Sequence, residues 1–97
     1  MNFSLHPEAE AELATAAAFY KQQAGVTLVS AFLAEFAHVA GLLVGNPGLG
    51  TRTESELRVY PLRRFPYSLI YRAVGRCIRI LVVGHQHRRP GYWRGRL

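Results

Sequence analysis

Residues 77–83 read CIRILVV and are apolar throughout, apart from Arg79. A strand whose side chains are buried on both faces shows this kind of continuous apolar run, whereas a strand with one wet face alternates. We therefore predict a strand over residues 77–83 at the centre of a sheet. Cys77, inside this run, is expected to be a buried small hydrophobic residue.

The residues just before this segment predict its hairpin partner. Residues 67–72 alternate, with Tyr67, Leu69 and Tyr71 on one side, as a half-buried strand does. Residues 73–76 contain a glycine and are short enough to connect two antiparallel strands. We expect these strands to lie side by side.

Further upstream, residues 57–62 form a short predicted strand. Pro61 lacks a backbone N–H, so this strand is expected at an edge or to be irregular. The preceding residues 47–55, PGLGTRTES, are predicted to be a loop because glycine, proline and hydroxyl residues dominate them.

Two helices are predicted between residues 7 and 45. Pro7 suits a first helical position, and three glutamates follow where the positive end of a helix favours them. Gly25 is the expected stop of the first helix, and the sequence Gly45-Asn46-Pro47 that of the second. The short link at Gly25 predicts an antiparallel helical hairpin.

Residues 2–5 alternate like a short strand, which completes the order strand, helix, helix, strand, strand, strand. This order predicts an α+β domain over residues 1–97, with the hairpin on one face of a small antiparallel-rich sheet and a basic tail at residues 85–97. The other face is expected to be partly open. Five arginines could line it: Arg58, Arg63, Arg64, Arg72 and Arg79.

The composition limits the classes of protein. With 97 residues, 49% of them hydrophobic and 19% charged, the chain is too short for two domains and too apolar to be disordered. A single cysteine and no leader-like N-terminus favour a cytoplasmic protein. Residues 26–44 are apolar on one side only and are not expected to span a membrane.

Charge is divided unequally along the chain. Residues 1–51 carry one lysine and four glutamates, whereas residues 52–97 carry eleven arginines and two glutamates, a formal charge of +9. Arginine binds phosphate and carboxylate groups through a planar fork and stacks on rings. We therefore expect an anionic partner, either nucleic acid or an acidic protein, with a membrane surface less favoured.

The segment HQHRRPGYWRGR, residues 85–96, combines two histidines, four arginines and two aromatic residues. Such a segment can grip phosphates and stack on bases. Equally, it can be a solvated basic end whose Tyr92 and Trp93 cover the sheet. The two histidines alone do not complete a zinc site, and the glycine-rich residues 41–50 match no nucleotide-binding fingerprint, so no metal or cofactor is predicted.

Four motifs together resemble the RelE/ParE superfamily of type II toxin–antitoxin toxins, and they are closer to ParE. They are HPEAEAEL at residues 6–13, NPGLG at 46–50, RRFPYSLIYR at 63–72 and GHQHRRPGYW at 84–93. The resemblance implies a β-α-α-β-β-β toxin that a cognate antitoxin neutralises by folding over its basic and apolar surface. It leaves open a homodimer or a toxin–antitoxin hetero-oligomer.

The resemblance also separates two activities. Ribosome-dependent nucleases of the RelE branch carry cations at positions that correspond here to Ser68 and Gln86, which are neutral, whereas Arg88 and Tyr92 remain. Loss of a cation that stabilises the transition state costs on the order of 10² to 10³ in rate. We therefore expect a toxin without enzymatic activity that binds and poisons DNA gyrase.

The residues expected to bind the target or the antitoxin are Arg88, Arg89, Tyr92 and Trp93, followed by Arg63, Arg64 and Arg72. The alternative is an mRNA endonuclease that acts on the ribosome through His85, His87, Arg88 and Tyr92. A third hypothesis is a degenerate toxin that only binds its antitoxin.

Overall fold

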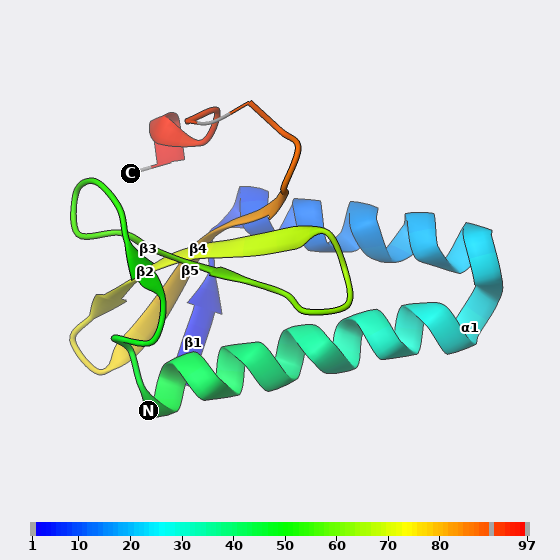
Figure 1. Cartoon of the computed structure of the whole chain (residues 1–97), viewed down its shortest axis with the longest axis horizontal. Coiled ribbons are helices and arrows are strands. Elements are labelled where there is room, and N and C mark those ends of the chain that lie inside the picture. Colours follow the sequence, from blue (N-terminus) through cyan, green and yellow to red (C-terminus); the bar gives the residue numbers. More distant parts are fainter. Residues whose placement is uncertain (1, 90, 97) are drawn as a thin grey trace.

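A helical hairpin covers one face of a five-stranded mixed sheet in the computed structural model, which describes residues 2–89 and 91–96 (Figure 1). The elements are β1 (Asn2–Leu5), α1 (Pro7–Gly45), β2 (Thr51–Arg52), β3 (Arg58–Pro61), β4 (Tyr67–Val74), β5 (Cys77–His85) and the short helix η1 (Arg94–Arg96). The strand order is β1-β5-β4-β3-β2, with β1 parallel to β5 and the other neighbours antiparallel. The predicted α+β fold is confirmed.

Strand β5 is buried on both faces, as its apolar run predicts. Ile78, Ile80 and Val83 join the core beneath α1, whereas Leu81 and Val82 join a second cluster on the opposite face. A register shift between β4 and β5 allows two successive residues to reach the second face, because a bulge adds one residue to a strand. Strand β4, between β5 and β3, is the middle strand of the five, so β5 lies one position from the predicted centre.

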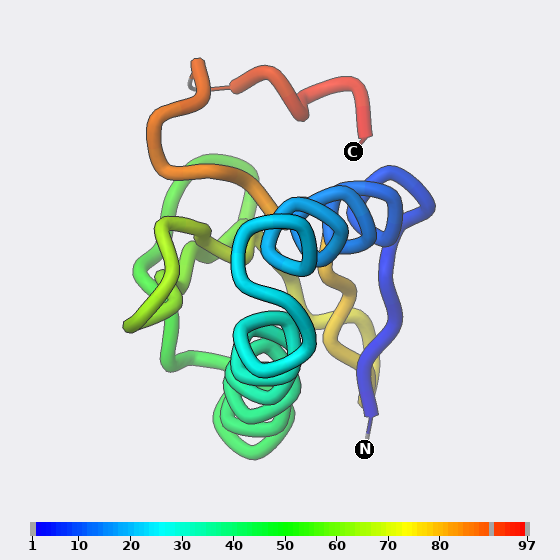
Figure 2. Tube along the Cα trace, turned by 90° about the vertical axis from the view of Figure 1, so that its right-hand side faces the viewer, coloured from blue at the N-terminus to red at the C-terminus, as the bar shows by residue number. Residues whose placement is uncertain are grey.

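Helix α1 is divided into two arms by a break at Ala24 and Gly25. Gly25 has φ of +74° and ψ of −157°, a backbone conformation that glycine alone adopts readily. The arms run side by side in opposite directions (Figure 2), and the rings of Tyr20 and Phe32 meet between them with centroids 5.0 Å apart. The predicted hairpin and its turn at Gly25 are confirmed.

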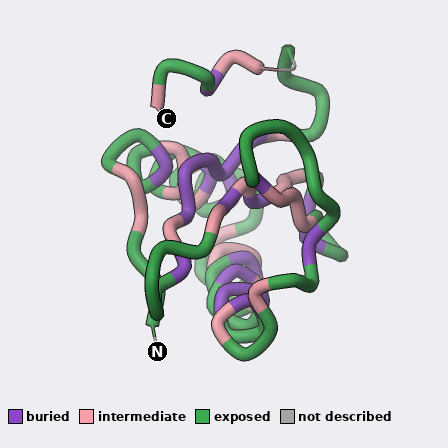
Figure 3. Tube along the Cα trace, turned by 90° about the vertical axis from the view of Figure 1, so that its left-hand side faces the viewer, coloured by how far each residue is buried: buried purple, intermediate pink, exposed green. Residues whose placement is uncertain are grey.

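By length and composition, α1 is apolar enough to cross a membrane. Its apolar side, however, faces the sheet: the buried residues of the second arm are Phe32, Phe36, Val39, Ala40 and Leu43. Figure 3 shows the same division, with buried residues in the strands and on one side of the helix, while the loops and most of the tail are exposed. The apolar stripe is therefore accounted for by packing against the strands.

The structure differs from the prediction at two places. The predicted loop 47–55 contains the two-residue strand β2, which pairs with β3, because a short exposed segment without alternation gives no sequence signal for a strand. Cys77 is exposed rather than buried, since it is the first residue of β5 at the end of the sheet, where its Sγ lies 3.0 Å from Asn2 Oδ1.

The second face of the sheet was predicted to be partly open, and this prediction is wrong for its middle. Trp93 returns from the tail to pack in a buried cluster with Leu57, Leu81 and Val82. Leu57 is fully buried just before β3, and Ile70 and Tyr92 pack against the cluster from its margin. The tail therefore closes this face as an integral part of the fold.

Candidate functional site

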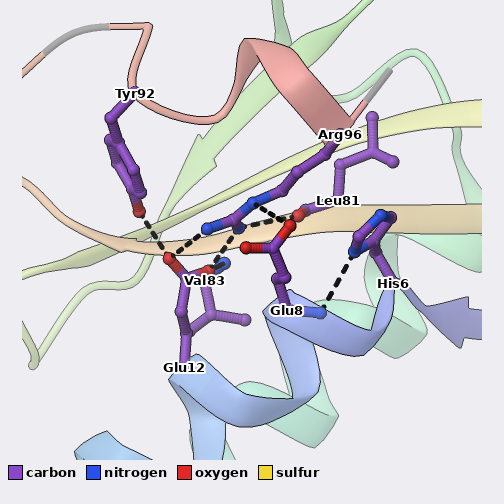
Figure 4. A network of polar contacts seen from close by, with 7 residues as sticks. All are labelled: His6, Glu8, Glu12, Leu81, Val83, Tyr92 and Arg96. Carbon is purple, nitrogen blue, oxygen red and sulfur yellow. Dashed lines mark hydrogen bonds and ion pairs between the residues drawn. The ribbon is translucent and has the colours of Figure 1, made fainter.

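A single carboxylate, that of Glu12 in the first arm of α1, holds the C-terminal tail in place (Figure 4). Arg96 donates to it through Nη1 at 2.7 Å and Nη2 at 2.9 Å, and the Tyr92 hydroxyl donates at 2.7 Å. The backbone N–H of Val83 in β5 donates at 3.0 Å. Glu12 thus joins the first arm, the sheet and the tail at one point.

The electrostatics of this group follow from its burial and its hydrogen bonds. Burial alone would raise the pKa of Glu12, but the hydrogen bonds from Arg96, Tyr92 and Val83 outweigh it, so the pKa lies below its ordinary value. Burial, together with the hydrogen bond to Glu12, raises the pKa of Tyr92 to about 12. The phenol therefore stays protonated at neutral pH.

The exposed side of this tail is cationic. The Arg88 guanidinium lies over the Tyr92 ring, with Cζ 4.0 Å from the centroid, and Arg89 beside it is exposed. A pocket of about 280 Å³ opens next to them. Its polar and aromatic lining residues are Ser68, His85, Gln86, Arg88, Arg89, Tyr92 and Trp93. We call this set, with His87, the tail site.

Trp93, predicted to contact a partner, is only 7% exposed and belongs to the core. Its ring supports the tail site from beneath, as in the alternative in which the tail covers the sheet. Gly84 in β5 is equally important here, because a Cβ at this position would lie 2.8 Å from Tyr92 Oη. Only a residue without a side chain lets Tyr92 approach the strand this closely.

His85 and His87 lie together at the end of β5. Their ring centroids are 5.3 Å apart, and the His87 backbone N–H donates to His85 Nδ1 at 3.1 Å. The His85 ring also meets Tyr67 edge-on at 5.2 Å. Within residues 2–89 and 91–96, no three side chains of His, Cys, Asp or Glu gather in a group that could hold a metal ion.

The two neutral positions singled out in the sequence, Ser68 and Gln86, both line the tail site. Gln86 Nε2 is already engaged, since it donates to the Tyr67 carbonyl at 3.2 Å. The Tyr92 hydroxyl is likewise committed to Glu12. The site therefore offers exposed cations and aromatic faces for binding, while its phenol is bound within the protein.

The other predicted binding arginines lie elsewhere. Arg63 and Arg64 are exposed in the β3–β4 loop beside the second arm of α1, where the Glu35 carboxylate accepts from both backbone N–H groups. Arg72 lies near the C-terminal end of β4, opposite Arg79 of β5. The structure thus separates these arginines from the tail site, and the five arginines predicted for one open face do not form a single surface.

Glu12 and Arg96 are the residues that sequence reasoning missed. Glu12 falls among the acidic residues near the start of a helix, where a favourable interaction with the helix dipole explains it fully. Arg96 is one arginine of many in a basic segment. Nothing local indicates that positions 84 residues apart form an ion pair with Nη1 and Oε1 at 2.7 Å.

Comparisons with known proteins agree with this geometry. The family model described as "ParE toxin of type II toxin-antitoxin system, parDE" matches residues 3–90. A search of curated proteins finds no match. A solved structure titled "Chromosomal ParDE TA system from P. aeruginosa" superposes with a TM-score of 0.75 at 25% identity, over 88% of this chain and 95% of the other.

The family match spans β1 to the start of the tail, and the structural match covers most of the same fold. Both point to the ParE side of the superfamily that the sequence motifs resemble. The chain belongs to the ParE toxin family of type II toxin–antitoxin systems.

Proposed function

We propose that this toxin inhibits growth by binding and poisoning DNA gyrase, with Arg88, Arg89 and Tyr92 of the tail site in the contact. The observation that carries the proposal is the commitment of the Tyr92 hydroxyl to Glu12 at 2.7 Å. A phenol bound in this way and with a pKa of about 12 is a poor proton donor or acceptor for cleavage of RNA at neutral pH. Its ring face and the stacked guanidinium remain suited to binding.

The same surface is proposed to bind a cognate antitoxin. Residues 52–97 carry a formal charge of +9, and Arg88 and Arg89 are exposed. An acidic segment that is disordered alone and folds on binding would neutralise this charge and cover the site. Solved ParDE pairs supply the precedent, since a matching structure bears that title.

The experiment compares two targets of the purified toxin. In the gyrase arm, supercoiled DNA is incubated with gyrase, ATP and toxin, and protein-linked double-strand breaks are measured. In the ribosome arm, mRNA ends are mapped in a translating extract. We expect gyrase-dependent DNA breaks and no new mRNA ends, and we expect added antitoxin to abolish the breaks.

The variants separate the tail site from general charge. Arg88→Glu and Arg89→Glu should abolish the breaks, whereas Arg76→Glu, with the same charge change on the β4–β5 turn, should leave them. Equal loss in all three variants would show that net charge alone matters. No effect on gyrase, on mRNA or on growth would favour the degenerate toxin that only binds its antitoxin.

The nuclease remains the second candidate because His85 and His87 lie together in the tail site with Arg88. Histidine exchanges protons near neutral pH and is the common general base. Cleavage of mRNA in the ribosomal A site that His87→Gln abolishes would establish this activity in place of the gyrase proposal.

A further inference from the structure

A second cationic site lies at the opposite end of the sheet from the tail. Arg52 of β2, Arg58 of β3 and Arg72 of β4 line a pocket of about 390 Å³. Arg72 lies near the C-terminal end of β4, whereas Tyr67, at the other end of that strand, pairs with His85, where the tail begins (Figure 1). The pocket is therefore distinct from the tail site, and it plays no part in the function proposed above.

The charges of this pocket are not balanced within the protein. Glu56 is the one carboxylate among its lining residues, so the lining carries a formal charge of +2. Every ion pair found among residues 2–89 and 91–96 involves Arg94 or Arg96, and none involves the three pocket arginines. Cations gathered without counter-charges repel one another, and an anion placed between them relieves that repulsion.

Two of the guanidiniums are positioned in ways that suit an anion. Arg58 Nη1 donates to the carbonyls of Gly50 at 2.8 Å and Gly48 at 3.4 Å, which fixes the side chain against the loop that forms one wall. The Nε–H of Arg72 is buried and has no hydrogen-bond partner among the described residues. Buried donors are almost always satisfied in folded proteins, so this one calls for an acceptor.

We propose that this pocket binds a dianionic oxyanion of the phosphate-monoester class. A phosphate monoester carries nearly two negative charges above its second pKa of about 6, which matches the net charge of the lining. Its three oxygens can accept from guanidiniums that approach from three strands, whereas a carboxylate has two oxygens and one charge. Arg52 is exposed and closes the site from the β2 edge.

The test uses inorganic phosphate as the probe at pH 7.5, with ionic strength held constant by chloride. Binding is followed by the Nε–H signals of the arginines in NMR spectra and by the thermal unfolding midpoint. The proteins are the wild type, Arg52→Gln, Arg72→Gln and the control Arg76→Gln. Acetate and a nucleoside 5′-monophosphate are titrated in parallel arms.

We expect phosphate to shift the Arg72 Nε–H signal saturably in the wild type and in Arg76→Gln, and to raise the unfolding midpoint of both. Loss of one charge-assisted contact should weaken binding about tenfold or more in Arg52→Gln. Arg52 makes no side-chain hydrogen bond within the described residues, so this variant tests the site even if Arg72→Gln does not fold.

Either of two phosphate sources supports the site. Tighter binding of the nucleoside monophosphate would show that the phosphate arrives on a nucleotide, and equal or weaker binding would show that free phosphate suffices. The proposal is overturned if Arg52→Gln binds phosphate as tightly as the wild type. It is equally overturned if acetate produces the same shift, or if the Arg72 signal does not move.

Discussion

At the scale of single residues, Glu12 has the largest structural role that its sequence context conceals. Its carboxylate accepts four hydrogen bonds, and its partner Arg96 has a side chain that is only 8% exposed. Glu12→Gln keeps the shape but removes the charge, which leaves the guanidinium partly buried without its counter-ion. We expect a loss of about 2 kcal/mol in the free energy of unfolding at pH 7, measured with denaturant.

The pH dependence of that loss follows from the pKa of Glu12. Its folded-state pKa lies below the ordinary value of 4.5, so the ionised carboxylate stabilises the fold above that pH. This contribution disappears as the pH falls through the folded-state pKa. The difference between the wild type and Glu12→Gln should therefore narrow on acidification below about pH 4.5. Glu10→Gln, an exposed change two residues away, is the control and should show neither effect.

Gly84 gives a second prediction at this scale. A methyl group there would lie 2.8 Å from Tyr92 Oη and 3.0 Å from Val82 Cγ1, closer than van der Waals contact permits. Gly84→Ala should displace Tyr92 from Glu12 and cost about 1–3 kcal/mol. Gly95→Ala, where no atom lies within 4 Å of the added carbon, is the control. Equal thermal midpoints for the two variants would contradict the tight approach of the tail to β5.

At the scale of elements, the hairpin of α1 depends on one backbone conformation. Gly25 has a positive φ, and a Cβ placed there would meet nothing within 4 Å, so any effect of Gly25→Ala is conformational. We expect a loss of about 1–3 kcal/mol. Gly41→Ala, within the exposed helical second arm, should instead stabilise by about 0.5–1 kcal/mol. Thermal melts of the two variants should move in opposite directions, and a shared direction would refute this account.

The elements themselves were largely predictable because local signals specify them. Periodicity marked β5 and β4, and Pro7, Gly25 and Gly45 marked the limits of the helical arms. Strand β2 was not predictable, since two exposed residues are strand only through their pairing with β3. In the site, composition drew attention to the tail, but the burial of Trp93 depends on contacts with residues far away in the sequence, which no local pattern encodes.

At the scale of the whole molecule, the tail links both layers of the fold. Trp93 packs with Leu81 and Val82 on the second face of the sheet, while Tyr92 and Arg96 bond to Glu12 on the helical hairpin. A tail tied to both layers should be lost only when the layers separate. This view differs from that of a loose basic appendage, which would detach before the sheet unfolds.

Trp93 is the one tryptophan of the chain, so its fluorescence reports the docking of the tail, whereas far-UV circular dichroism reports the helices and sheet. In a denaturant titration we expect the two signals to change at the same midpoint with the same slope, because the second cluster and the main core share strands β4 and β5. Trp93→Phe should keep the dichroism transition near its wild-type midpoint, while Trp93→Ala should lower the stability by about 3–5 kcal/mol through the cavity it leaves. A fluorescence change that precedes the loss of dichroism would mean that the tail folds separately, and the tail site would then be a flexible arm rather than a surface held ready for its partner.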